Sequence, residues 1–258
     1  MVATGPGGWF DGNMQRRDAQ ILTPDGLCSA TLHLPGQPGP AVVLYPDAGG
    51  ARDVMRAMGD RLASWGYVVL VPDVYYREGN WQPFNMATAF GDTQERGRLF
   101  ATMGTLTPDR IDADAGSFLD FLADQPEVTG ELVGLTGYCM GGRISLRVAA
   151  THASRVGAVA SFHGGNLAKA DDLNSPHHLA GRITGVVLIA AAEEDASFPA
   201  EQEQLLGQVL TDAGVRHTIE TYPAKHGFAV TDNPTYDEGA AQRHWKALED
   251  LYGATLGH

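Results

Sequence analysis

The hexapeptide Gly137-Tyr-Cys-Met-Gly-Gly142 places a nucleophilic side chain among three glycines. It follows the apolar run Leu132–Thr136 and opens an amphipathic stretch, which indicates a turn from a buried strand into a helix. A nucleophile on such a turn has a strained backbone and needs small neighbours so that the chain can pass. The positive end of the following helix would point at the Cys139 sulfur and favour the thiolate. A buried structural cysteine in a glycine-rich turn is the alternative interpretation.

Two later polar side chains add a candidate acid and a candidate base. Asp195 follows the apolar run Thr184–Ala190, and His226 follows the last apolar run of the chain. Nucleophile, acid and base then occur in the chain order of the α/β-hydrolases. Because ligands bind at the carboxyl ends of the strands in open α/β sheets, we expect the three side chains to converge at that edge. Glu193 and Glu194 are rival acids.

The segment Tyr45-Pro-Asp-Ala-Gly-Gly50 follows the first apolar run of the predicted parallel sheet. In this fold, the equivalent turn supplies one N–H group to the oxyanion hole, so the N–H groups of Ala48 and Met140 are candidate donors. Asp47 in the same turn is interpreted as a turn or helix-capping residue. His163 ends a further predicted strand and is expected to line the pocket; it is the less favoured base because the base comes last in this chain order.

Short apolar runs alternate with stretches of helical spacing through most of the chain. This alternation predicts a mostly parallel sheet with helices on both faces, in a single domain over residues 15–258 after a flexible leader over residues 1–14. Thr23-Pro-Asp-Gly26 predicts the turn of an N-terminal β-hairpin. Asn80–Met103 is expected to form a partly helical cap or pocket wall. The predicted strands are 17–22, 27–34, 41–45, 67–71, 132–136, 156–162, 184–190 and 216–222, and the predicted helices are 52–65, 112–123, 142–150, 199–213 and 238–252.

The composition limits the partners and the compartment. The 258 residues include 18 basic and 31 acidic side chains, giving a net charge of −13, which argues against nucleic acid and anionic membranes as partners. Two cysteines in a chain of this length indicate reduced thiols rather than a disulfide framework. The N-terminal residues lack the features of a signal peptide, and no apolar run is long enough to span a bilayer. The sequence therefore predicts a cytoplasmic protein.

Four segments together resemble the dienelactone hydrolase (carboxymethylenebutenolidase) family. They are Tyr67–Arg77, Gly134–Gly142, Glu194-Asp195 and His226–Phe228, and the resemblance extends over about residues 20–255. It implies the α/β-hydrolase fold and a triad of Cys139, His226 and Asp195. It also implies no metal or organic cofactor, and a monomer or homodimer.

The resemblance also implies residues around the thiol and the substrate. The family has an acid at the position of Asp47 that engages the resting cysteine, usually Glu, so Asp47 is one methylene shorter. Arg96 matches one of two arginines that bind the substrate carboxylate, whereas Val230 stands at the position of the other. Phe100 stands where the family enzyme has Tyr. Tyr138 and His163 are placed with these substrate-binding or thiol-modulating residues.

Three functions remain open. The first is hydrolysis of small esters or lactones through a thioester on Cys139, and the second is a broad thiol-dependent carboxylesterase. The third is a ligand-binding or thiol-sensing module without turnover, since a fold alone does not settle function.

Overall fold

The strongest apolar runs become the central strands of one sheet. In the computed structural model, which describes residues 14–257, every residue of β3 (Gly39–Tyr45) and β4 (Val68–Pro72) is buried. Strands that are apolar throughout belong in the middle of a sheet covered on both faces. The leader expected over residues 1–14 lies, apart from Met14, outside the described residues.

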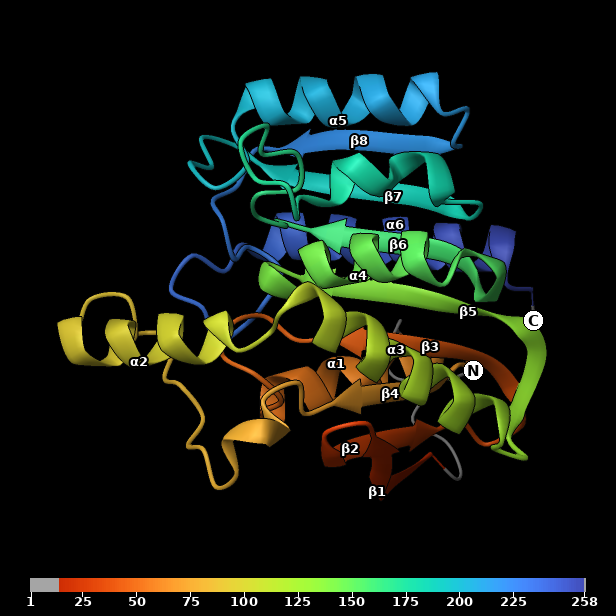
Figure 1. The fold of residues 1–258 in the computed structure, drawn as a ribbon. Coiled ribbons are helices and arrows are strands. Elements are labelled where there is room, and N and C mark those ends of the chain that lie inside the picture. Colours follow the sequence, from red (N-terminus) through yellow and green to blue (C-terminus); the bar gives the residue numbers. More distant parts are fainter. Residues whose placement is uncertain (1–13, 258) are drawn as a thin grey trace, which may run out of the picture.

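The sheet has eight strands in the order β1-β2-β4-β3-β5-β6-β7-β8 (Figure 1). The strands from β4 to β8 are parallel, whereas β1 and β2 form an antiparallel hairpin that joins the sheet against β4. The α/β-hydrolase-type prediction of a mostly parallel sheet with an N-terminal hairpin is therefore confirmed. The remaining strands are β1 (Gln15–Thr23), β2 (Gly26–Leu34), β5 (Val128–Tyr138), β6 (Val156–Phe162), β7 (Val186–Ala192) and β8 (His217–Tyr222).

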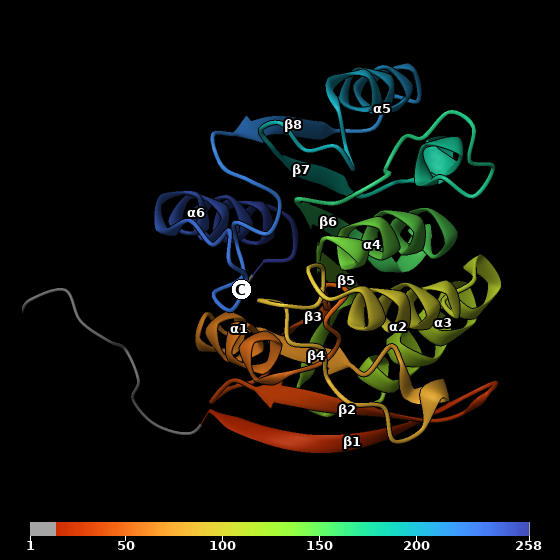
Figure 2. The ribbon, with the colours of Figure 1, turned by 90° about the vertical axis from the view of Figure 1, so that its left-hand side faces the viewer.

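Helices cover both faces of the sheet (Figure 2). One face packs against α1 (Asp53–Ser64) and α6 (Glu238–Thr255), and the other against α3 (Pro108–Ala123), α4 (Met140–Thr151) and α5 (Ala200–Asp212). Predicted and observed helix ends differ by at most four residues, the largest difference being the start of α3, where Pro108 occupies the first turn. No helix within residues 14–257 is long and apolar enough to cross a bilayer.

Asn80–Met103, the segment expected to cover the pocket, contains most of α2 (Thr93–Gly104). The N-cap residue of this helix is Asp92. The Asp92 side chain accepts hydrogen bonds from the N–H groups of Gln94 and Glu95, as helix-capping residues do. Figure 1 shows α2 projecting beyond the carboxyl ends of the parallel strands, with its last turn nearest the sheet. The expected partly helical cap is therefore present at the carboxyl edge of the sheet.

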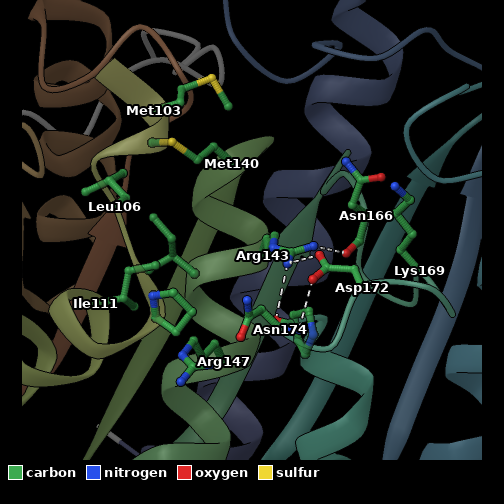
Figure 3. A pocket seen from close by; sticks show the side chains of 13 residues that line it. Met103, Leu106, Ile111, Met140, Arg143, Arg147, Asn166, Lys169, Asp172 and Asn174 are labelled. Atoms are coloured by element: carbon green, nitrogen blue, oxygen red, sulfur yellow. Dashed lines mark hydrogen bonds and ion pairs between the residues drawn. The ribbon is translucent and has the colours of Figure 1, made fainter. Parts of the chain in front are cut away.

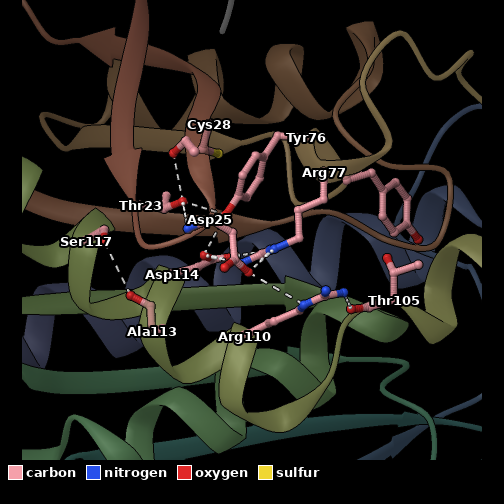
Figure 4. Close-up of polar contacts among 12 residues, drawn as sticks. Thr23, Asp25, Cys28, Tyr76, Arg77, Thr105, Arg110, Ala113, Asp114 and Ser117 are labelled. Carbon is pink, nitrogen blue, oxygen red and sulfur yellow. Dashed lines mark hydrogen bonds and ion pairs between the residues drawn. The ribbon is translucent and has the colours of Figure 1, made fainter.

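A buried ionic cluster joins the hairpin turn to α3 (Figure 4). Arg77 binds both carboxylate oxygens of Asp114 at 2.7 and 2.8 Å and also binds Asp25 at 2.7 Å. The side chains of Arg77 and Asp114 are less than a tenth exposed, so each compensates the other's buried charge. Cys28 is fully buried beside this cluster, and burial, followed by the nearby acids Asp73 and Asp114, raises the pKa of its thiol. Cys28 is thus a structural cysteine.

Candidate active site

Cys139 occupies the turn between β5 and α4 with a backbone conformation of φ 52° and ψ −114°. Positive φ is uncommon outside glycine, and such strain gathers at functional sites. The turn is held because the Cys139 N–H donates to the Phe162 carbonyl at 3.1 Å, and the side chain is partly exposed. The predicted strand–turn–helix setting of the cysteine is confirmed, and the buried-cysteine alternative is wrong.

The three motif glycines are required because other parts of the chain approach them closely. A Cβ atom on Gly137 would lie 2.0 Å from the Gly141 carbonyl oxygen, and one on Gly141 would lie 2.2 Å from that of Tyr45. A Cβ on Gly142 would lie 2.3 Å from the Ser161 hydroxyl oxygen. Side chains at these positions would push the cysteine turn away from β3 and β6.

His226 and Asp195 meet beside Cys139, as expected. Nδ1 of His226 lies 2.6 Å from one carboxylate oxygen of Asp195, whose side chain is almost fully buried. The other oxygen accepts hydrogen bonds from the Ser197 N–H at 2.8 Å and hydroxyl at 2.7 Å. The rivals Glu193 and Glu194 are exposed. Asp195, rather than either glutamate, is therefore the carboxylate in contact with the imidazole.

The charges around His226 stabilise its protonated form. Burial alone would lower the pKa of the imidazole, but the charge of Cys139 and hydrogen bonds with Asp195 and Cys139 raise it to about 10. The pKa of Asp195 is lowered: burial acts to raise it, and the hydrogen bond and charge of His226 outweigh that effect. An imidazolium between a carboxylate and a sulfur is thus the favoured arrangement near neutral pH.

Two residues of the described chain with unpaired backbone donors line the same space. Ala48 and Met140 both line the cavity that contains Cys139. Within residues 14–257, neither of their N–H groups donates a hydrogen bond to another protein atom. The Tyr75 hydroxyl donates to the Ala48 carbonyl at 3.0 Å and contacts the Met140 sulfur at 3.3 Å, so it fixes the two segments relative to each other. These N–H groups are available to a developing oxyanion.

Asp47 is held by Arg52 and makes no hydrogen bond to Cys139 in the described part of the chain. Its carboxylate accepts from the Gly49 N–H at 2.9 Å and from Arg52 at 2.6 and 3.0 Å. Arg52 also binds Asp232 twice at 2.7 Å. The expected contact between Asp47 and the resting cysteine is therefore absent, because the guanidinium group takes both carboxylate oxygens.

The cavity at Cys139 has a volume of about 630 Å³ and an apolar wall. Phe100, half exposed, lies in this wall as expected, with Phe90 at a ring-centroid distance of 6.4 Å. Arg96, one turn earlier in α2, is exposed and is not part of the wall. The lining comprises Ala48, Phe90, Phe100, Met103, Cys139, Met140, Arg143, Gly165, Asn166, Glu193, Glu194, Asp195, Ala196, Ser197, Lys225, His226 and Thr235.

His163, expected to line the pocket, does not line the cavity at Cys139, and Tyr138 is not among the lining residues either. His163 is 1 % exposed, and its ring packs edge-on behind His226 at a centroid distance of 5.1 Å. Burial, with a smaller effect from the charges of His226 and His244, holds the pKa of His163 well below its usual value. Tyr138 is fully buried, and its hydroxyl lies 3.3 Å from Nε2 of His244. Val230 is also fully buried, so the position of the second arginine implied by the resemblance holds an uncharged side chain in the core.

The structure adds residues that sequence reasoning missed. Arg143 follows the glycine pair directly and lines the cavity, a position that its neighbours in the motif could have indicated. Ser197 binds Asp195, and the Thr235 hydroxyl donates to the His226 carbonyl at 2.5 Å. Arg52 is a partner of Asp47 that no local motif marks.

Comparison with known proteins gives relatives along nearly the whole chain. A Salmonella typhi protein named "Putative carboxymethylenebutenolidase" is 28 % identical over 277 residues, covering 98 % of this chain and 97 % of its own length. A Synechocystis protein of the same name is 28 % identical over 220 residues, covering 84 % of this chain and 87 % of the relative.

Solved structures agree with the fold. A crystal structure from Klebsiella pneumoniae, described as a putative dienelactone hydrolase, has a TM-score of 0.81 at 23 % identity and covers 94 % of this chain and 99 % of that one. A dienelactone hydrolase-like promiscuous phosphotriesterase from metagenomic libraries has a TM-score of 0.75 at 27 % identity, covering 95 % and 100 %. The model of the dienelactone hydrolase family matches residues 28–256, so the chain belongs to the dienelactone hydrolase family of hydrolases that act on ester or lactone bonds.

Proposed function

We propose that Cys139 is the nucleophile, His226 the proton carrier and Asp195 the orienting acid of an ester or lactone hydrolase. The position of His226 carries the proposal. Its Nδ1 lies 2.6 Å from Asp195 while the ring hydrogen-bonds to Cys139 in the wall of a cavity of about 630 Å³. A nucleophile and a base in hydrogen-bond contact, with the base oriented by a third group, form the arrangement that covalent catalysis needs.

In the acylation step, the Cys139 thiolate forms a carbon–sulfur bond with the substrate carbonyl. The carbonyl electron pair moves onto oxygen, where the N–H groups of Ala48 and Met140 bind the oxyanion. As the carbon–oxygen bond of the ester breaks, the leaving alkoxide takes the proton of the His226 imidazolium. The products of this step are an alcohol and a thioester; with a lactone, the alcohol remains attached to the acyl group.

In the deacylation step, neutral His226 accepts a proton from water as the water oxygen bonds to the thioester carbon. The carbon–sulfur bond then breaks and its electron pair returns to sulfur. This restores the thiolate and the imidazolium and releases the acid. Asp195 stays ionised throughout and keeps the Nδ1 proton directed away from the reacting atoms.

The apolar wall of the cavity accommodates a range of neutral ester substrates. Arg96 lies outside it and Val230 is buried, so the two positions that the resemblance assigns to carboxylate binding supply no cation at the reacting carbonyl. Phe90, Phe100, Met103 and Met140 instead form an apolar wall, which suits a neutral acyl or alcohol group.

The test compares two cysteine variants of the purified protein. Cys139→Ala should lower kcat for p-nitrophenyl acetate and for an aryl lactone by about a thousandfold or more, whereas Cys28→Ala should retain turnover. Circular dichroism and a thermal scan show whether both remain folded. Full turnover by Cys139→Ala would overturn the proposal, and rapid alkylation of Cys139 by iodoacetamide without hydrolysis of any ester would favour the thiol-sensing module.

A further inference from the structure

A second cavity adjoins the one that contains Cys139. It has a volume of about 400 Å³ and shares four lining residues with the first: Met103, Met140, Arg143 and Asn166. Met140 follows the nucleophile directly, and its side chain lines both spaces. An acyl group bound to Cys139 therefore has a second space beside it that a small lactone would leave empty.

The two walls of the second cavity differ in character (Figure 3). Met103, Leu106, Ile111 and Met140 present apolar side chains on one side, and charged or amide side chains lie on the other. A ligand with an apolar chain and a polar end would match both walls. Each methylene buried against the apolar wall contributes about fourfold in affinity. The polar end needs a partner on the polar wall, because burying it unpaired would be costly. The polar side comprises Arg143, Asn166, Lys169, Asp172 and Asn174, and Arg147 lies at the base of the cavity below Ile111.

The cations of this cavity are not equally available. Arg143 is bound to Asp172 at 2.6 Å, and Arg147 is bound to both oxygens of Asp112 at 2.8 and 2.6 Å. Lys169 has only a looser contact, 3.6 Å from the exposed Asp171 carboxylate. Because exposed ion pairs at such distances contribute little, Lys169 can exchange Asp171 for another carboxylate at small cost.

We propose that the second cavity binds the far end of the acyl group of an extended ester, an apolar chain that ends in a carboxylate. The chain lies along Met140 and the side chains of Leu106 and Ile111, and its terminal carboxylate pairs with Lys169. This inference rests on the proposed esterase function and deepens it, since it names the class of ester.

The first experiment measures kcat/KM for p-nitrophenyl esters of linear acids from acetate to octanoate, and for the mono-p-nitrophenyl ester of octanedioic acid. The value should rise by up to about sixteenfold with each pair of methylenes that enters the cavity, and the terminal carboxylate should add about tenfold over octanoate. A flat series, or a lower value for the carboxylate ester than for octanoate, overturns the inference. Absence of hydrolysis of every ester, acetate included, overturns the proposed function itself.

Substitutions in the second cavity test whether the preferences for a long acyl chain and for a terminal carboxylate arise there. Leu106→Trp and, independently, Ile111→Trp should lower the ratio of octanoate to acetate kcat/KM by about tenfold. Lys169→Gln should abolish the preference for the carboxylate ester while keeping the preference for octanoate over acetate. Leu27→Trp in the exposed hairpin and Lys246→Gln on α6 are the matched controls and should leave both ratios unchanged. Unchanged ratios in folded Leu106→Trp and Ile111→Trp would overturn the inference.

Discussion

Arg52 binds the buried carboxylate of Asp47 through two contacts of 2.6 and 3.0 Å. The other edge of the same guanidinium group binds Asp232, which lies six residues after His226 in the chain. Arg52 thereby connects the turn that carries the Ala48 N–H to the loop that follows the base. One side chain thus holds both the segment that supplies a proposed oxyanion donor and the segment that follows the proposed base.

Replacing Arg52 should destabilise the protein strongly. Arg52→Met leaves the Asp47 carboxylate, 2 % exposed, without its cation, and losing one partner of a buried pair costs about 3 kcal/mol or more. Urea unfolding followed by circular dichroism measures the loss. The matched control is Arg56→Met, since Arg56 pairs with the fully exposed Asp53 and such exposed pairs contribute little to stability. Equal losses in the two variants would contradict the assigned role.

The protonation of His226 should depend on Cys139. In the intact site, the histidine ring should stay protonated through neutral pH, with a pKa of about 10. Cys139→Ala removes the charge that raises this pKa most and should bring it down. Ring resonances in histidine NMR spectra, assigned by their loss in His226→Gln, report the titration. An unchanged midpoint in Cys139→Ala would show that sulfur and imidazole are not coupled.

His163 should make the protein sensitive to acid. Its two ring nitrogens have no hydrogen-bond partner among the described residues, and its pKa is held well below the ordinary 6.5, chiefly by burial. Below pH 6.5 the unfolded chain therefore binds a proton that the folded chain excludes, so this residue makes stability fall as the pH drops, by about 1 kcal/mol per pH unit.

His163→Leu should remove that dependence. At pH 7 the change should have little effect on stability, since no hydrogen bond is lost and an apolar side chain of similar size replaces a polar one. Urea unfolding at pH 7 and pH 5 measures both effects. A slope in His163→Leu as steep as in the wild type would contradict the account.

Replacing glycine by alanine should change stability in opposite directions at a motif position and at a position in α2. Gly137→Ala should prevent normal folding, because its Cβ would lie 2.0 Å from the Gly141 carbonyl oxygen. Gly97→Ala in α2 has open space around the new Cβ and should stabilise the protein by about 0.5–1 kcal/mol through better helix propensity. Thermal unfolding distinguishes the two. A folded Gly137→Ala with a normal melting temperature would refute the close approach.

Local patterns were sufficient for the fold and for the convergence of Cys139, Asp195 and His226. Buried strands appear as short apolar runs, and parallel strands bring their carboxyl ends to one edge regardless of distance along the chain. The glycines around Cys139 also predicted a close approach of neighbouring chain segments, because only residues without a Cβ fit there. These inferences needed only neighbouring residues and a general rule of topology.

Other positions depend on packing that no local pattern contains. Arg52 meets Asp232 across 180 residues, so its role could not be predicted from either segment alone. Arg96 is exposed and lies outside the cavity, although Phe100, one turn later in α2, lines it, and the spacing of these residues does not specify that difference. Tyr138 adjoins the nucleophile in sequence, but its side chain enters the core and contacts His244 on α6.

The central claim is that an acyl group is transferred to the sulfur of Cys139. Mass spectrometry of protein quenched during turnover of p-nitrophenyl octanoate tests this claim most directly. The account predicts a mass increase of one octanoyl group on the peptide that contains Cys139, and none in Cys139→Ala. An acyl group found on another residue, or turnover that continues in Cys139→Ala without any adduct, would contradict it.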